Sequence, residues 1–170
     1  EYAKEMVTGF IQLDGVTVGA VANRTAIYDE NGEKAEEFAA VLTTDGAYKA
    51  AEFVTFCNAF EIPVLSLTNV KGFEANVRAE KTIAKAAAKL VYAFSNADVP
   101  KVNVITGEAY GSAYVAMNSK SVGADMVYAW SQASIGMMDA SLAAKIMYAD
   151  EIAAADDVTA KINEKASEYA

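Results

Sequence analysis

The hydrophobic and polar positions of the chain fall into β-type runs and helical runs, and a pair of β-type runs comes first. Residues 6–13 and 16–22 are rich in β-branched and aromatic side chains, and Asp14-Gly15 separates them. Asp-Gly between two such runs is a strong signal for a tight turn, so this stretch is predicted to be a β-hairpin. Asn31-Gly32 marks a second turn. Residues 33–42, with acidic side chains early, are predicted to form a helix.

Helical spacing governs the next stretch. Thr44 or Asp45 can cap a helix over residues 47–60. Its apolar side chains recur every three to four positions, which predicts one buried face made of Ala50, Phe53, Val54, Cys57 and Phe60. Because free cysteine is usually buried, Cys57 is predicted to be a core residue rather than a nucleophile.

Apolar runs and helical runs continue to alternate along the rest of the chain. A second long helix is predicted over residues 79–96, and Asp139 or Ser141 can cap a closing helix that continues to residue 170. A buried strand is predicted at residues 64–70, and further strands are predicted at residues 101–106, 125–130 and 133–137. Strands alternating with helices imply right-handed β-α-β connections. The predicted fold class is therefore α/β, with a mostly parallel sheet flanked by helices, in a single domain over residues 1–170.

The junction at residues 109–114 organises the middle of the chain. A strand run leads into Gly111-Ser112-Ala113, which opens a helical run. Such a junction gathers backbone N–H groups that can hold negative charge. A second strand run ends in the loop Lys71-Gly72-Phe73, and two such loops from neighbouring parallel strands could supply the two donors of an oxyanion hole. The alternative is structural: small side chains at the turn let a helix pack closely on a sheet.

Composition narrows the class of protein. The 170 residues suit one domain with a sizeable core, and a 54% hydrophobic share indicates surface buried against something else. The net charge of −9 argues against nucleic acid and anionic membranes as partners, because both favour clustered Lys and Arg. No apolar run approaches the roughly 20 residues that span a bilayer, and no signal peptide is visible. The expected location is therefore the cytoplasm, without membrane insertion.

The scarcity of histidine and cysteine excludes several kinds of catalytic and metal site. The chain has no histidine and one cysteine, which excludes an internal disulfide, a Cys/His metal site and catalysis by Ser-His-Asp or Cys-His. Glu108 and Asp139 lie at strand ends, where a helix cap or a surface position accounts for each. A solvated loop accounts for Lys71. What remains is catalysis by backbone N–H groups, with no substrate identified by the residues themselves.

Several stretches together resemble the carboxyltransferase family of biotin-dependent acyl-CoA carboxylases and decarboxylases. They keep the family's order and spacing from residue 1 to about residue 138. The stretches are VTGF (7–10), LDG (13–15), VGAVAN (18–23), AEFVTFCNAF (51–60), IPV (62–64), GF (72–73), AKLVYA (88–93), VPKV (99–102), AYGSAY (109–114), GAD (123–125) and AW (129–130). The resemblance covers the second, C-terminal half of a carboxyltransferase subunit.

The resemblance implies a crotonase-like fold of repeated ββα units that binds the biotin end of the reaction. The implied activity is carboxyl transfer between carboxybiotin and the α-carbon of a short acyl-CoA. Its cofactor is biotin on a separate carrier protein or domain, its substrate is an acyl-CoA, and it needs no metal. The implied partners are the biotinylated carrier protein, the N-terminal carboxyltransferase half and further copies in a homo-oligomer. The isolated chain is expected to be inactive.

The resemblance also implies which residues act. In the family, backbone N–H groups of the turn hold the ureido oxygen of biotin, and a facing glycine loop shapes the site. The implied catalytic residues are Ser112, Ala113, Gly72 and Phe73. The implied biotin-binding residues are Tyr110, Gly111, Val115 and Lys71.

The chain departs from the family pattern around these loops. Gly111-Ser112 stands where the family has two glycines, Lys71 stands where it has proline, and residues 74–76 replace a Pro-Gly pair. Two other functions remain open: a crotonase-type enzyme that acts on acyl-CoA without biotin, such as a hydratase or decarboxylase, and a non-catalytic half that supports an oligomer.

Overall fold

The computed structural model describes residues 2–169 and begins with the predicted hairpin. Strand β1 (Met6–Leu13) pairs antiparallel with β2 (Val16–Asn23). Asp14 and Gly15 form the turn with φ angles of 50° and 81°. A two-residue turn of this kind needs positive φ at both positions, which aspartate tolerates and glycine adopts freely. The Asp-Gly prediction is confirmed.

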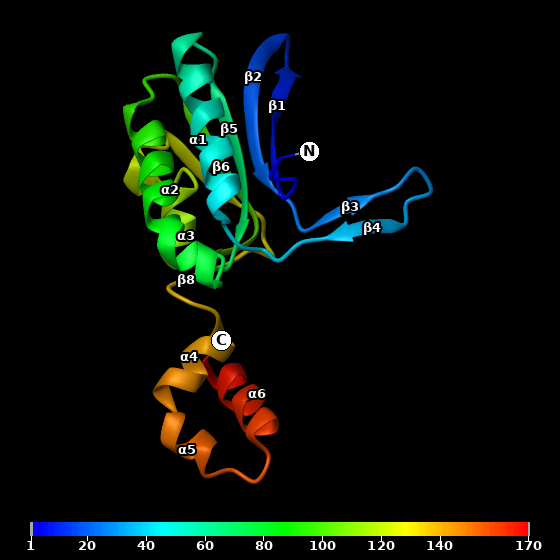
Figure 1. Cartoon of the computed structure of the whole chain (residues 1–170), viewed down its shortest axis with the longest axis vertical. Coiled ribbons are helices and arrows are strands. Elements are labelled where there is room, and N and C mark those ends of the chain that lie inside the picture. Colours follow the sequence, from blue (N-terminus) through cyan, green and yellow to red (C-terminus); the bar gives the residue numbers. More distant parts are fainter. Residues whose placement is uncertain (1, 170) are drawn as a thin grey trace. The chain divides into compact units, whose positions relative to one another are not determined.

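The sheet continues with strands parallel to β2. β5 (Val64–Val70), β6 (Lys101–Tyr110) and β7 (Met126–Ala129) give the order β1-β2-β5-β6-β7, and β8 (Ser134–Gly136) also pairs with β6 (Figure 1). All pairings from β2 to β7 are parallel. The prediction of an α/β fold with a mostly parallel sheet is therefore confirmed.

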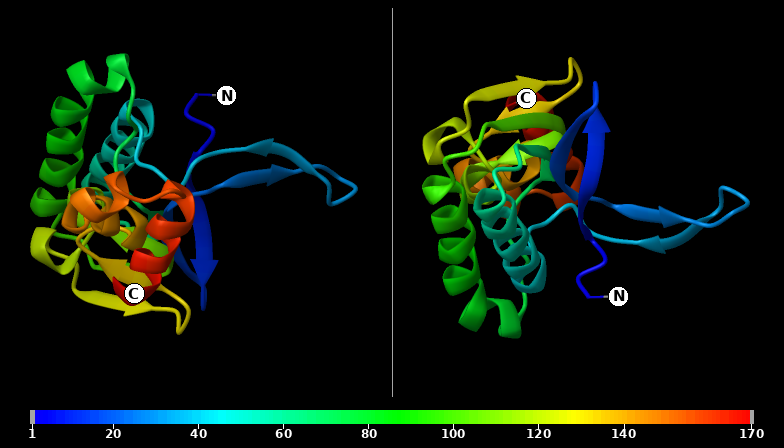
Figure 2. Two further views of the ribbon diagram at one scale, coloured as in Figure 1. Left: turned by 90° about the horizontal axis from the view of Figure 1, so that it is seen from below. Right: turned by 90° about the horizontal axis from the view of Figure 1, so that it is seen from above.

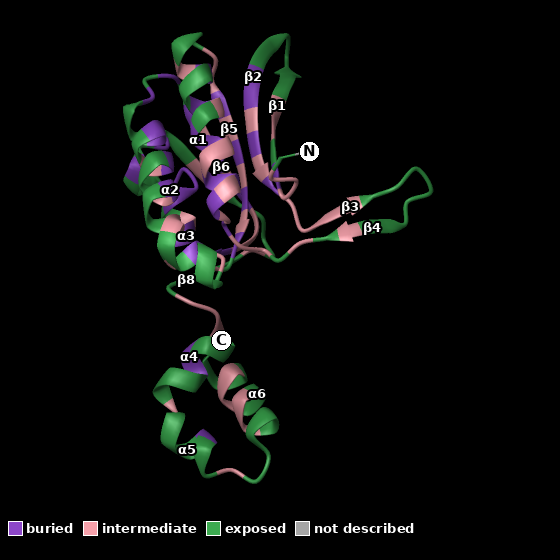
Figure 3. Cartoon of the chain, in the orientation of Figure 1, coloured by how far each residue is buried: buried purple, intermediate pink, exposed green. Residues whose placement is uncertain are grey.

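Three helices pack on one face of this sheet: α1 (Thr44–Ala59), α2 (Val77–Asn96) and α3 (Gly111–Ala116), the last followed by the short 3-10 helix η1 (Lys120–Val122). The core lies between these helices and the sheet, and Figure 3 shows the buried positions along α1, α2 and β5. Alternate residues of β5 are buried toward the helices: Val64, Ser66, Thr68 and Val70. Cys57 is fully buried on α1, and burial raises the pKa of its thiol, as its predicted core position requires.

The predicted helix over residues 33–42 is wrong. β3 (Ala26–Tyr28) and β4 (Lys34–Glu37) instead form a separate hairpin that projects from the sheet (Figure 2). The predicted Asn31-Gly32 turn lies at its tip, where the Asp29 carboxylate accepts the N–H groups of Asn31 and Glu33 at 2.8 and 2.9 Å. That side-chain turn competes with a helix start, so the early acidic residues are turn residues.

The predicted bounds of α1 need two corrections. Its cap is Thr43 rather than Thr44 or Asp45, because the Thr43 hydroxyl accepts the Gly46 N–H at 2.9 Å. Phe60 is 64% exposed rather than buried, since the helix ends at Ala59 and Phe60 leaves the helical path. The other predicted face residues are buried or half-buried.

The helical run after the Gly111 turn, expected from the sequence to end near Lys120, is shorter. α3 ends at Ala116, because Asn118 adopts a positive φ of 59° and turns the chain out of the helix. The strand before the turn is longer than predicted and reaches Tyr110.

Residues from Gly136 onward form a second compact unit. It contains α4 (Ala140–Met147), α5 (Ala149–Ala153) and α6 (Val158–Tyr169). Asp139 caps α4 by accepting the Leu142 N–H at 2.8 Å, as predicted. The prediction of one continuous closing helix is wrong. The backbone leaves the α-helical path at Tyr148, and a new cap at Asp157 starts α6. Within residues 2–169 we find no helix that is both long and apolar enough to cross a membrane.

Leu90→Ala should lower the free energy of unfolding by about 2–5 kcal/mol, because the Leu90 side chain is fully buried and its loss leaves a cavity. Phe60→Ala, which removes an exposed ring, should cost about 1 kcal/mol or less. Urea unfolding of both variants measures the difference. Equal losses would contradict the placement of Phe60 outside the core.

Candidate functional site

The site begins where two neighbouring parallel strands end. Val70 of β5 pairs with Ala109 of β6 as the last pair of their ladder. The loop at residues 71–73 and the turn at residues 110–113 therefore leave the same edge of the sheet. Because β5 and β6 are parallel neighbours, the two loops lie side by side, as predicted.

The turn after β6 presents backbone donors. Tyr110 is extended (φ −117°, ψ 136°) and α3 starts directly at Gly111, with no side-chain cap found in the described residues. The first N–H groups of a helix have no acceptor within the helix. Gly111 has a φ of 58°, which glycine adopts without strain. Ala113 is only 1% exposed, whereas the Ser112 side chain is exposed.

The facing loop is held from one side by the segment before α1. Lys71 N–H donates to Ala40 O at 2.8 Å, Leu42 N–H to Gly72 O at 2.9 Å, and Glu74 N–H to Leu42 O at 3.0 Å. Because C=O and N–H point opposite ways across a trans peptide, the Gly72 carbonyl that faces Leu42 turns the Phe73 N–H away from it. The Phe73 N–H is thus directed away from the segment that holds the loop.

The remaining predicted site residues lie around these two loops. The Tyr110 hydroxyl is 2.6 Å from Ser134 Oγ of β8, which ties its ring to that strand. Val115 is 37% exposed on α3, and the Lys71 side chain is exposed. The structure therefore collects all eight predicted residues at one end of β5 and β6.

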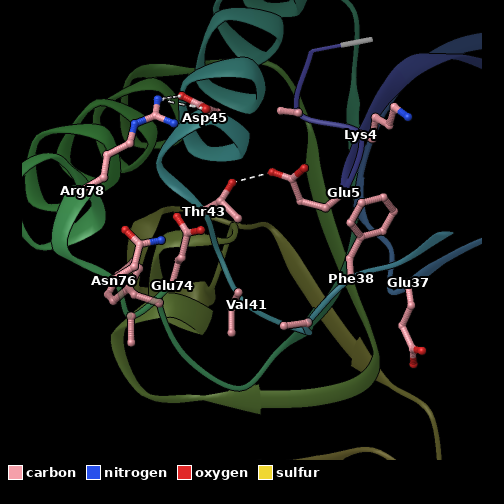
Figure 4. Close-up of a pocket in the computed structure, with 14 residues that line it drawn as sticks. Lys4, Glu5, Glu37, Phe38, Val41, Thr43, Asp45, Glu74, Asn76 and Arg78 are labelled. Atoms are coloured by element: carbon pink, nitrogen blue, oxygen red, sulfur yellow. Dashed lines mark hydrogen bonds and ion pairs between the residues drawn. The ribbon is translucent and has the colours of Figure 1, made fainter.

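A cavity of about 760 Å³ lies beside the second loop (Figure 4). Phe73, Phe38 and Val41 give it apolar walls, and its charged lining consists of Lys4, Glu5, Glu37, Asp45, Glu74 and Arg78. The Arg78 guanidinium donates to both oxygens of Asp45, at 2.9 and 3.1 Å. The cavity was not predicted, because residues 33–42 were expected to form a helix.

Asn69, near the end of β5, was likewise not predicted as a site residue. Its carboxamide oxygen accepts the Glu108 N–H at 2.9 Å. The one available signal was a polar residue near the end of an apolar strand. Within residues 2–169, no group of three or more Cys, Asp or Glu side chains is arranged to hold a metal ion.

The model of the carboxyl transferase domain matches residues 1–170. The chain belongs to the carboxyl transferase family. It is 43% identical to the putative propionyl-CoA carboxylase beta chain of Bacillus subtilis and 41% identical to the methylmalonyl-CoA carboxyltransferase 12S subunit of Propionibacterium freudenreichii subsp. shermanii. Each comparison covers 99% of this carboxyl transferase chain, and 31% and 30% of the relatives. The chain thus spans less than a third of their length.

Solved structures agree with this assignment. A transcarboxylase 12S hexamer, with methylmalonyl-CoA and methylmalonic acid bound, matches with a TM-score of 0.81 at 40% identity, over 99% of this chain and 32% of that one. The beta subunit of P. aeruginosa geranyl-CoA carboxylase matches with a TM-score of 0.80 over 99% and 32%. Its sequence identity is 22%, so this match supports the fold alone. The predicted crotonase-like fold of the carboxyl transferase family is confirmed.

Gly111→Ala should lose about 1–2 kcal/mol of stability, because a β-carbon at a φ of 58° is strained. Gly72→Ala should change stability by at most about 1 kcal/mol, since an added β-carbon there meets nothing within 4 Å. Thermal unfolding of the two variants measures the two losses of stability. A larger loss in Gly72→Ala than in Gly111→Ala would mean that the wrong glycine has been assigned as conformationally required.

Proposed function

We propose that this chain is the biotin-side part of a carboxyltransferase that moves a carboxyl group between carboxybiotin and the α-carbon of a short acyl-CoA. The observation that carries the proposal is the family match over residues 1–170, together with 41–43% identity to propionyl-CoA and methylmalonyl-CoA enzymes. That match also supports one crotonase-like domain over both compact units. The proposed location of this carboxyltransferase is the cytoplasm.

The residues present fit a biotin group. When bound, carboxybiotin supplies the carboxyl group and develops negative charge on its ureido oxygen. The backbone N–H groups of Ser112 and Ala113, which have no acceptor within α3, would donate to that oxygen. Donors already fixed in place stabilise developing charge without reorganisation, which lowers the barrier.

The other loop completes the proposed wall of the site. Gly72 leaves open space beside the strand end, and the Phe73 ring and N–H lie next to it. Tyr110, Gly111 and Val115 would flank the bound group from the side of α3, and the exposed Lys71 would add positive charge. A site of this kind needs no histidine, because its donors are backbone groups.

The proposed partners are a biotinylated carrier protein, the rest of a carboxyltransferase subunit and further copies of that subunit. One relative, the transcarboxylase 12S, assembles as a hexamer. This chain spans only 32% of that relative's chain. The sheet face away from α1–α3 supports the proposal, because it carries a group of apolar side chains: Ile11, Leu13, Leu65, Leu67, Val102 and Val104. Parallel sheets are normally covered on both faces.

Ser112→Pro should lower carboxyl transfer by roughly 100-fold or more in the assembled enzyme, because it deletes one donor to the developing charge. Proline is accepted in a first helical turn, so the fold should be kept. Ser112→Ala keeps the N–H and should lose far less activity. Transfer from carboxybiotin to short acyl-CoAs, with circular dichroism as the folding check, measures both. A folded Ser112→Pro enzyme with wild-type turnover contradicts the assignment.

The chain expressed alone should show no measurable carboxyl transfer. Holding two reactants in line supplies about 7–11 kcal/mol of a two-substrate barrier, and a chain that forms one wall loses most of it. The same assay, with and without the remaining part of the subunit, tests this. Full turnover by the chain alone would indicate a complete one-domain enzyme.

A further inference from the structure

The ladder between β5 and β6 is interrupted just before both loops of the proposed site. Thr68 pairs with Ile105, and the next pair is Val70 with Ala109. Between these pairs β5 has one intervening residue and β6 has three, so β6 bulges. The residues that carry the site thus start from an irregular part of the sheet.

Two side chains make hydrogen bonds to backbone groups at this irregularity. The Thr106 hydroxyl donates to Thr68 O at 3.3 Å, and the Asn69 carboxamide oxygen accepts the Glu108 N–H at 2.9 Å. Without them, two half-buried backbone groups would lack these partners. Backbone groups away from water need partners, so these side chains fix the shape of the bulge.

Asn69 is held in place from its other side. Its N–H donates to Asn23 Oδ1 at 2.8 Å, and Asn23 Nδ2 donates back to Asn69 O. Asn23 ends β2 and is 9% exposed. Two carboxamides in a row therefore connect β2, β5 and β6 at the base of the loops.

Gly107 completes this contact. A β-carbon at Gly107 would lie 2.6 Å from Asn69 Oδ1 and 2.9 Å from Asn69 Cγ, closer than real β-carbons approach such atoms. All three nearest atoms belong to the Asn69 carboxamide. The glycine is thus required by the side chain of Asn69, not by its own backbone angle.

We propose that Asn69 is the positioning residue that sets the spacing between the two loops of the carboxyl-transfer site. It lies two residues before Lys71, and its acceptor bond reaches Glu108, two residues before Tyr110. It acts on the reaction through the β6 backbone that leads to Ser112 and Ala113. The inference rests on the proposed function and adds a residue that the family resemblance did not assign.

The test is a double-mutant cycle in the assembled enzyme. Asn69→Ala and Gly107→Ala should each lower kcat, up to about 100-fold, because small misplacements of a positioned group cost that much. The KM for acyl-CoA should change little. Gly107→Ala acts by displacing the Asn69 carboxamide, so the double variant should be no slower than Asn69→Ala. If the fold-loss of kcat in the double variant equals the product of the two single losses, the proposal is wrong.

Two controls separate positioning from general destabilisation. Gly9→Ala also adds a methyl group to a strand glycine, but there it meets nothing within 4 Å, so in the chain alone the amide exchange of residues 108–113 should stay at the wild-type value. Asn69→Asp keeps an acceptor oxygen for the Glu108 N–H and should retain more of kcat than Asn69→Ala. If Asn69→Asp and Asn69→Ala lose kcat equally, the acceptor bond is not what matters, and the proposal is wrong.

Amide hydrogen exchange distinguishes this proposal from the proposed function, since it needs no turnover. Exchange of the amides of residues 108–113 should be faster in Asn69→Ala and Gly107→Ala and near wild type in Asn69→Asp. Unchanged exchange in the first two variants would overturn the role of Asn69. A wild-type enzyme that transfers no carboxyl group would instead overturn the proposed function, and the exchange rates would still decide whether Asn69 positions the turn.

Discussion

The parallel pairing of β5 with β6 is the constraint on which the rest of the structure depends. Parallel neighbours end at the same edge of the sheet, so the loop after β5 and the turn after β6 meet there without further help. The helices cover one face of the sheet and bury alternate residues of β5, so the strand ends are where the two loops are exposed together. In α/β sheets, the carboxyl ends of the strands are where ligands bind.

Polar groups inside the core hold the helices to this pair of strands. Asn103 Nδ2 donates to Met117 O at 3.1 Å, and the Thr68 hydroxyl donates to Asn103 Oδ1 at 2.8 Å, so the end of α3 is tied to both strands. Lys101, only 6% exposed, donates from Nζ to the carbonyl oxygens of Phe94 and Ala97 at the end of α2. A positive charge at a helix C-terminus is favourable, and loss of a buried partner is costly. These bonds fix where each helix ends on the sheet.

Local signals in the sequence predicted much of this fold. Asp14-Gly15 identified the first hairpin because its turn needs two positive φ angles, and Asp139 identified the start of α4 because an aspartate there can cap a helix. The stretch at 33–42 was mispredicted because acidic residues suit a helix start and a side-chain turn equally well. Asn69 could not be found from the sequence, since its role depends on a bulge in a strand 39 residues away. Register irregularities arise from tertiary pairing and leave no local pattern.

The departures from the family pattern acquire a physical meaning in this structure. Ser112 stands where the family has a second glycine, but it lies within α3, so only Gly111 needs the freedom of glycine. The substitution therefore keeps the N–H group in place and adds a hydroxymethyl group on the exposed side. Lys71 stands where the family has proline, and its N–H donates to Ala40 O, a bond that proline cannot make. One departure thus alters what a ligand would meet, and the other adds a tether that holds the facing loop to the segment before α1.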